Sequence, residues 1–149
     1  MVKLTHSTKS TKANTISRQW HLIDLSGQVL GRAIPKIAYL LQGKNKVNYS
    51  PNLDSGDFVV VINIKKVVIT GRKSESKKYT YFSGYPGGLR TRSYKDLQKD
   101  KPGEIVRHAV SGMLPKNKLR DKRLKRLFTY TDDNHPYYDK LKIVNNKNG

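Results

Sequence analysis

The residues with the clearest chemical meaning form a dense run of cations at positions 116–126. A single acid, Asp121, accompanies them, so ion pairs along a helix would leave most of the charge unneutralised. Like charges at this density repel one another unless phosphates lie between them. The run therefore favours a phosphate-binding surface over an ordinary solvated helix face. Its basic residues are Lys116, Lys118, Arg120, Lys122, Arg123, Lys125 and Arg126.

A second basic cluster surrounds a glycine-rich loop at residues 84–88 (Gly-Tyr-Pro-Gly-Gly). Its cations are Arg72, Lys73, Lys77 and Lys78 before the loop and Arg90, Arg92 and Lys95 after it, and the aromatic residues among them are Tyr79, Tyr81, Phe82, Tyr85 and Tyr94. Cations with flat rings suit folded RNA, where phosphates take charge and unstacked bases take stacking. Tyrosines at strand spacing can equally pack against a core, and both interpretations stay open at this point. Gly87 and Gly88 would let the backbone approach a phosphate or sugar without a Cβ clash.

Signatures of nucleotide-dependent enzymes and metal sites are missing from the sequence. There is no Gly-x-Gly-x-x-Gly, and Gly43-Lys44 fails the Walker A pattern, because Ala38 replaces the first glycine and Asn45 the hydroxyl residue. Cysteine is absent, which excludes disulfides, thiolate nucleophiles and cysteine-containing zinc sites. The histidines do not have metal-ligand spacing; they are His6, His21, His108 and His135. We therefore expect no metal and no cofactor.

Two positions resemble catalytic residues but have simpler explanations. His108 falls within a helical pattern, where a packed or RNA-facing histidine is the expected role. Asp54 and Asp57 flank Ser55-Gly56 and could be taken for paired carboxylates. Acids beside Ser-Gly more often form a turn, here before the strand that begins at Phe58. We expect no catalytic residue.

Charge and composition also point to a polyanionic partner. The 149 residues include 30 Lys and Arg against 11 Asp and Glu, a formal net charge of +19 at pH 7. Self-repulsion on this scale destabilises a compact monomer unless a polyanion supplies counter-charge. Hydrophobic residues make up 36%, enough for a modest core in one domain. With no apolar run of about 20 residues and no signal-peptide pattern after Met1, we expect an intracellular protein that binds nucleic acid.

The elements that must position these residues alternate between strands and helices. The expected strands are Trp20–Leu25, Phe58–Ile62, Val67–Ile69 and Tyr79–Phe82; the expected helices are residues 31–42, Pro102–Met113 and a third with Leu119, Leu124 and Leu127 on one face. The continuous β-branched run at residues 58–62 is typical of a strand buried on both faces. This order predicts an α/β domain with helices on both sides of a small, mostly parallel sheet.

Both ends of the chain differ in composition from this domain. Residues 1–19 contain four cations and no acid and are expected to form a flexible basic arm. An organelle transit peptide is the alternative, although such peptides favour Arg and this arm contains mostly Lys. Residues 137–149 are expected to form an irregular tail. The predicted organisation is an arm at 1–19, one domain at 20–136 and a tail at 137–149.

A series of short motifs, in order from Trp20 to Pro136, resembles the bacterial-type large-subunit ribosomal protein L13 family. The most specific is Ala-Val-x-Gly-Met-Leu-Pro-Lys, which here is residues 109–116 (Ala-Val-Ser-Gly-Met-Leu-Pro-Lys). The others are Leu30-Gly31-Arg32, Leu41-Gln42-Gly43-Lys44, Asp54-Ser55-Gly56-Asp57, Val61-Ile62-Asn63, Thr70-Gly71, the loop at 84–88 and His135-Pro136. The chain departs from the family at Arg120-Asp121, where Gly-Arg is usual, at Asp132, where Gly is usual, and at Tyr137, where a second His is usual. RNA contacts at Arg120-Asp121 are therefore not carried over from the family.

The resemblance implies a three-layer α/β/α domain that binds large-subunit ribosomal RNA, supports subunit assembly and stability, and meets neighbouring ribosomal proteins without catalysis. The implied location is the ribosome of the cytoplasm or of an organelle, with no membrane contact and no homo-oligomer. The expected RNA-binding residues are Arg32, Lys44, Lys46, Arg72, Lys73, Tyr85, Gly87, Gly88, Arg90, Arg92, Lys116, Lys118, Arg120, Lys122, Arg123, Lys125 and Arg126. Two alternatives remain: a regulatory RNA-binding protein acting off the ribosome, and an RNA-modifying enzyme on the same fold.

Overall fold

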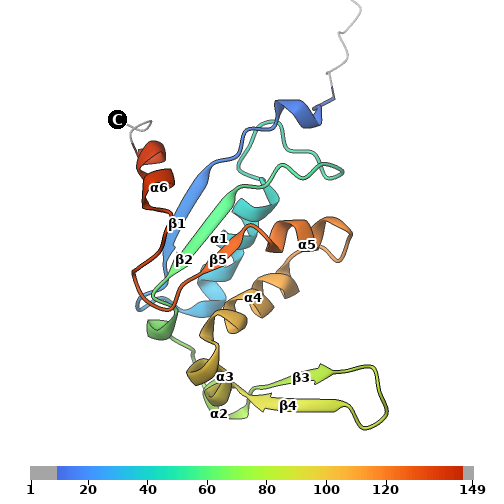
Figure 1. The fold of residues 1–149 in the computed structure, drawn as a ribbon, viewed down its shortest axis with the longest axis vertical. Coiled ribbons are helices and arrows are strands. Elements are labelled where there is room, and N and C mark those ends of the chain that lie inside the picture. Colours follow the sequence, from blue (N-terminus) through green and yellow to red (C-terminus); the bar gives the residue numbers. More distant parts are fainter. Residues whose placement is uncertain (1–9, 146–149) are drawn as a thin grey trace, which may run out of the picture.

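A three-stranded parallel sheet forms the centre of the fold, and its middle strand is the expected β-branched run (Figure 1). The computed structural model describes residues 10–145, and the side chains of the last helix as far as Leu141; residues 1–9 of the expected arm and 146–149 of the expected tail lie outside the described part. The strands are β1 (Trp20–Asp24), β2 (Phe58–Ile62) and β5 (Leu127–Thr129), in the order β1-β2-β5. Four of the five residues of β2 are buried, because the sheet is covered on both faces.

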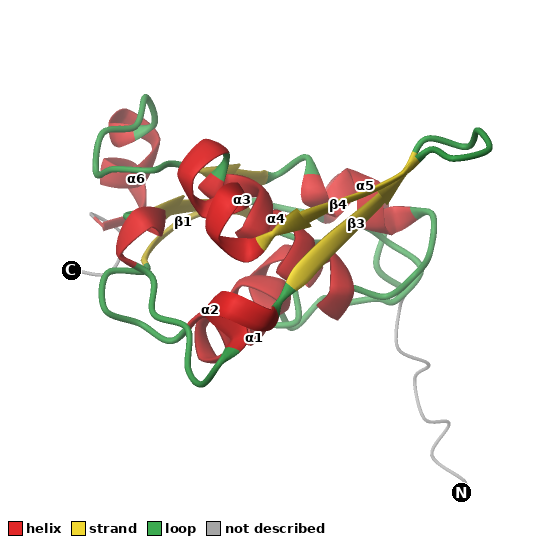
Figure 2. Ribbon diagram, turned by 90° about the horizontal axis from the view of Figure 1, so that it is seen from below, coloured by secondary structure: helices red, strands yellow, loops and turns green. Residues whose placement is uncertain are grey.

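Helices α1 (Leu30–Gln42) and α4 (Pro102–Met113) cover one face of the sheet (Figures 1 and 2). Alternate strand residues point to this side, so Ile23, Val59 and Val61 join the helices in one hydrophobic core. Helix α1 ends at Gly43, whose φ of 77° is the left-handed conformation that glycine adopts readily. Both helices were expected from their apolar periodicity, and both are confirmed.

The opposite face carries a stack of aromatic rings that the C-terminal segment covers. Trp20 stacks on Phe58 at a centroid distance of 4.4 Å and on Phe128 at 5.7 Å, and Tyr137 packs against Trp20 at 4.9 Å. Helix α6 (Tyr138–Asn145) follows and lies beside β1. The expectation of an irregular tail was wrong here, since contact with these rings orders a segment that has little periodicity of its own. With this helix, the three-layer α/β/α architecture is confirmed.

A two-stranded antiparallel hairpin projects away from this domain (Figure 2). It consists of β3 (Lys78–Phe82) and β4 (Leu89–Ser93), and short helices α2 (Lys73–Ser76) and α3 (Tyr94–Asp100) flank it. Strand β4 was not predicted from the sequence, because Leu-Arg-Thr-Arg-Ser lacks an apolar face. In the hairpin Tyr81 is paired with Arg90, and Tyr79 with Arg92. Lys78, before the glycine loop, and Arg90 and Arg92, after it, thus lie on one ribbon.

Three further details differ from the sequence-based expectations. Val67–Ile69 is not a strand, and only Val68 forms an isolated bridge, with Val29, after the 3₁₀ turn η2 (Ile64–Lys66). Helix α5 (Leu119–Leu124) is shorter than expected, because Leu127 belongs to β5. Residues 10–19 include the 3₁₀ turn η1 (Ala13–Thr15) and end in contacts with the domain. No helix in the described part of the chain is long and apolar enough to span a membrane.

We predict that Val60→Asp unfolds the isolated protein, whereas Leu22→Asp does not. The two residues are register partners on neighbouring strands, but Val60 is 0% exposed and Leu22 is 47% exposed. An unpaired carboxylate at the buried position should cost about 3–5 kcal/mol, a large part of a typical domain's stability. Circular dichroism melts of both variants test this. A native melting curve for Val60→Asp would contradict the interior position of β2.

Candidate nucleic-acid interface

Most of the expected RNA-binding residues lie on the surface, in three regions. The hairpin and the segment before it, the turn and helix at 116–125, and the α1 region each contribute exposed residues. The exposed ones are Arg32, Lys44, Arg72, Lys73, Tyr85, Gly87, Arg90, Arg92, Lys116, Lys118, Lys122 and Lys125, and Gly88 and Arg120 are partly exposed. We call the exposed cations of the hairpin region (Arg72, Lys73, Lys77, Lys78, Arg90, Arg92) and of residues 116–125 (Lys116, Lys118, Arg120, Lys122, Lys125) the basic surface.

Two of the expected RNA contacts, Arg123 and Arg126, lie inside the protein instead. Both terminal nitrogens of Arg126 donate to the two carboxylate oxygens of Asp54, and the Arg123 Nε lies 3.9 Å from the same carboxylate. Arg123 is only 1% exposed, so its charge is not available to a phosphate. Burial opposes ionisation of Asp54, but the hydrogen bonds and charges of Arg126, with the charges of Arg18 and Arg123, lower its pKa. The structure therefore corrects these two assignments to structural ones.

Lys46 is the third cation that the structure places inward. Its ammonium group contacts the carboxylate of Asp57 and donates to the carbonyls of Ser17 (2.6 Å) and Ser55 (2.8 Å). Asp57 is fully buried and also accepts a hydrogen bond from the Gln19 backbone N–H at 3.0 Å. With these partners satisfied, Lys46 has a structural role rather than the expected RNA contact. The same contacts hold the end of the N-terminal arm against the domain.

The pKa of Asp57 shows how strongly its environment favours the charged form. Burial would raise this pKa, but hydrogen bonds from His21, from the Gln19 backbone and from Lys46 outweigh burial and lower it from 3.8 to about 2. The His21 Nε2 lies 3.0 Å from Asp57 Oδ2. A carboxylate held by several donors is a structural anion. This supports the turn-and-strand role expected for Asp54 and Asp57.

The turn that carries these acids fits closely against the end of α1. A Cβ on Gly56 would lie 1.8 Å from the Leu41 carbonyl oxygen, and one on Gly43 would lie 2.5 Å from the Ser55 carbonyl oxygen. Real Cβ atoms do not approach oxygens so closely, so both positions require glycine. The spacing of two acids around Ser-Gly was visible in the sequence. Its partners were not, because they come from residues 18–21, 46 and 123–126.

The aromatic residues near the hairpin divide between core and surface. Tyr79 and Tyr94 are each 3% exposed, and burial raises the pKa of both. The ring of His108 packs edge-on against Tyr79 at 5.2 Å, although His108 itself is exposed. For Tyr79 and Tyr94 the core interpretation is correct, whereas Tyr85 is 74% exposed at the hairpin tip.

Glycines of the hairpin loop are required by the turn itself. Gly87 has a φ of 73°, which side-chain-bearing residues rarely adopt, and a Cβ on Gly88 would lie 2.0 Å from Ser83 Oγ. The Gly88 N–H donates to the Tyr85 carbonyl at 2.9 Å. The loop therefore has a defined shape that presents Tyr85 outward.

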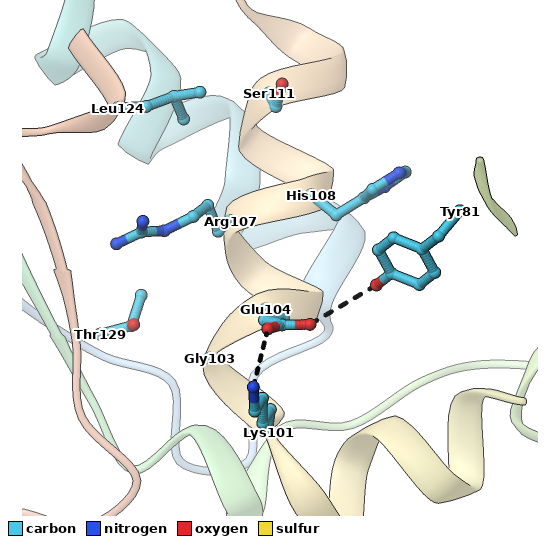
Figure 3. Close-up of a pocket in the computed structure, with 9 residues that line it drawn as sticks. All are labelled: Tyr81, Lys101, Gly103, Glu104, Arg107, His108, Ser111, Leu124 and Thr129. Atoms are coloured by element: carbon cyan, nitrogen blue, oxygen red, sulfur yellow. Dashed lines mark hydrogen bonds and ion pairs between the residues drawn. The ribbon is translucent and has the colours of Figure 1, made fainter. Parts of the chain in front are cut away.

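A groove of about 600 Å³ lies along α4, between the hairpin and the end of α5 (Figure 3). Glu104, Arg107, His108 and Ser111 form its floor, Tyr81 lies on the hairpin side, and Leu124 and Thr129 lie on the other. Lys101 and Gly103 complete one end. These residues were not predicted as a site from the sequence, because only the fold brings the hairpin and α5 to the same face of α4. In the sequence, these residues were marked only by the polar side chains that recur on the face of α4 opposite its apolar stripe.

Comparison with known proteins places this architecture in a family. The model of the family Ribosomal protein L13 matches residues 18–136. The chain belongs to the ribosomal protein L13 family. It is similar to the large ribosomal subunit protein uL13 of Rubrobacter xylanophilus, with 50% identity over 122 residues that cover 82% of this chain and 85% of the relative. The uL13 of Caldanaerobacter subterraneus is 50% identical over 126 residues (85% and 88%), and that of Syntrophotalea carbinolica 47% identical over 131 residues (88% and 92%).

Two departures from the family pattern now have structural contexts in this L13-family chain. Tyr137, in place of the usual His, packs on Trp20 and also on Phe128 at 4.7 Å. The substitution therefore extends the aromatic stack over the sheet. At the start of α5, the Arg120 Nε lies 3.9 Å from Asp121 Oδ1, and the Asp121 side chain is largely exposed. This acid offsets part of the positive charge of the basic surface.

Acid should remove the contribution of Asp57 to stability. Its folded pKa of about 2 lies below the ordinary 3.8, so its stabilisation is complete above pH 3.8 and disappears as pH falls toward 2. A shift of this size corresponds to about 2 kcal/mol. Urea unfolding between pH 2 and 6 should show this loss in the native chain, and a flatter profile in a less stable Asp57→Asn. Asp121→Asn, at an exposed carboxylate, is the control and should keep the native profile.

Neighbouring cations should respond in opposite ways to the same substitution. Arg126→Gln breaks a buried ion pair and should lower the free energy of unfolding by on the order of 3 kcal/mol. Lys125→Gln removes an exposed charge and should leave stability nearly unchanged, while RNA affinity falls modestly and in a salt-sensitive way. Chemical denaturation and RNA titration of both variants measure the two effects. Equal loss of stability in both would contradict the division into inward and outward cations.

Proposed function

We propose that this chain is a structural constituent of the large ribosomal subunit, and that it binds ribosomal RNA through the basic surface. The observation that supports this most directly is the contrast between its two sets of cations. Cations that lie inward each have a carboxylate partner in Asp54 or Asp57. Among the residues that the structure describes, only one cation of the basic surface lies within ion-pair distance of an acid: the Arg120 Nε is 3.9 Å from an Asp121 carboxylate oxygen.

The chemistry of such a surface matches RNA. Exposed Lys and Arg side chains without carboxylate partners gain counter-charge from phosphates, and binding releases the counterions of the nucleic acid. The exposed ring of Tyr85 at the hairpin tip adds a flat group that a splayed base can stack on. The names of the uL13 relatives place those proteins in the large subunit. The role proposed for this chain is therefore architectural: it would neutralise and hold RNA segments and contact neighbouring subunit proteins.

We also propose that the chain acts by binding RNA and not by catalysis. The carboxylates that could have formed a catalytic pair, Asp54 and Asp57, are each occupied by cations of the protein. Their ionised forms stabilise the fold, which leaves neither of them as a proton donor near neutral pH. This supports the binding role over the RNA-modifying alternative.

Affinity for large-subunit ribosomal RNA should fall steeply as salt rises. With six or more phosphate contacts, a loss on the order of 10³-fold is expected between about 50 and 200 mM salt. Titration of the RNA with the purified chain at several salt concentrations measures the slope. A flat response would contradict binding through phosphates.

Sedimentation separates an integral component from the regulatory alternative. Large subunits purified from cells that express the tagged chain are washed at high salt and sedimented again. A component embedded in the subunit should stay with the particle, because many contacts must break together. A regulatory factor bound at the surface should instead appear in the supernatant, and that result would overturn the proposed role.

A further inference from the structure

The groove along α4 lies between the two parts of the basic surface and, unlike them, has a carboxylate on its floor. Glu104 lies between the hairpin and the end of α5, with cationic or polar groups around it (Figure 3). A carboxylate repels phosphate, so this groove is not suited to the RNA backbone alone. It is suited to a group that offers N–H donors and is held near phosphates.

Both oxygens of Glu104 retain the capacity to accept stronger hydrogen bonds. The Tyr81 hydroxyl donates to Oε2 at 3.5 Å, and the Lys101 ammonium lies 3.8 Å from Oε1. Both distances are at the long limit for such contacts, and a carboxylate has about four acceptor positions. A ligand with two adjacent N–H donors could therefore bind both oxygens in place of these contacts.

The walls of the groove match a flat ligand that carries a phosphate. The partly exposed Tyr81 ring lies on one side, where a base could stack, and the apolar Leu124 lies on the other. The exposed guanidinium of Arg107 lines the groove, where its weak 3.5 Å hydrogen bond to the Leu127 carbonyl leaves donors for a phosphate. The volume of the groove, about 600 Å³, is within the usual range for small-molecule sites.

We propose that this groove binds one unstacked nucleotide of RNA and favours guanine, whose adjacent N1–H and N2–H groups would pair with Glu104. The proposal rests on the proposed RNA-binding function and deepens it by assigning one base-reading site on the protein. Uracil presents a single N–H between two carbonyl oxygens, which the carboxylate would repel. Specific recognition of RNA typically reads unstacked bases in this way, through their edges and faces.

The test measures binding of the full chain to four seven-nucleotide RNAs that contain uridines and a single central G, A, C or U. We expect the G-containing RNA to bind on the order of tenfold more tightly than the all-uridine RNA. Glu104→Gln should abolish this preference, because its amide NH₂ faces one of the two donors. Glu75→Gln makes the same charge change at an exposed acid that does not line the groove, and should keep the preference.

A second pair of variants tests stacking in the same assay. Tyr81→Leu should weaken binding of every RNA whose central base enters the groove, whereas Tyr81→Phe keeps the ring and should weaken binding less. Melting curves of all variants confirm that they are folded.

Equal affinity of the native chain for all four RNAs would overturn the site, as would a guanine preference that survives Glu104→Gln. Salt-dependent binding of large-subunit ribosomal RNA by the same preparations distinguishes the two proposals. If that binding persists without a guanine preference, only the nucleotide site is wrong. If it is absent as well, the proposed function fails.

Discussion

The fold depends on one short turn, Asp54 to Asp57, that supplies two buried or nearly buried anions to a strongly cationic chain. Asp54 holds Arg126 and lies within ion-pair distance of Arg18 and Arg123, while Asp57 holds Lys46 and contacts His21. These partners come from the N-terminal segment with the start of β1, from the loop after α1, and from the end of α5 with the residues just after it. Removing one partner of a buried ion pair is costly, because the other charge is left without water or a counter-ion. The turn therefore joins three distant segments at the end of the sheet where all three strands begin.

This arrangement also separates the cations by role. Those that contact the turn neutralise its acids and are withdrawn from the surface. Those that remain outside lie on the hairpin and along residues 116–125, next to opposite ends of α4 (Figure 1). The core of sheet and helices holds the hairpin cations and the cations at residues 116–125 in fixed relative positions. A surface of this kind can bind phosphates at several points at once, and the proposed nucleotide site lies in the groove between them. The architecture thus explains how a small core can present a net charge of +19 to a polyanion.

Local sequence patterns were sufficient to predict the strands at 20–25 and 58–62, helices α1 and α4, the hairpin strand β3 and the family. Each of these has a strong periodicity or a continuous β-branched run, and such patterns report burial directly. The net charge and the motif series indicated RNA and the L13 family before the fold was known. Most candidate cations lie in segments with few acids, and this was enough to predict that they are exposed.

Only the tertiary structure could decide which cations lie inside. Lys125 and Arg126 are adjacent and both basic, yet one is exposed and the other binds Asp54, 72 positions away. Strand β4, strand β5 and helix α6 were missed for the same reason: their order comes from contacts with β3, β2 and the Trp20 ring, not from their own residue patterns. The groove also exists only because the hairpin and α5 reach the same helix face. Composition determines how much charge a chain carries, whereas long-range pairing determines where each charge lies, because an ion pair depends on distance in space and not on separation in sequence.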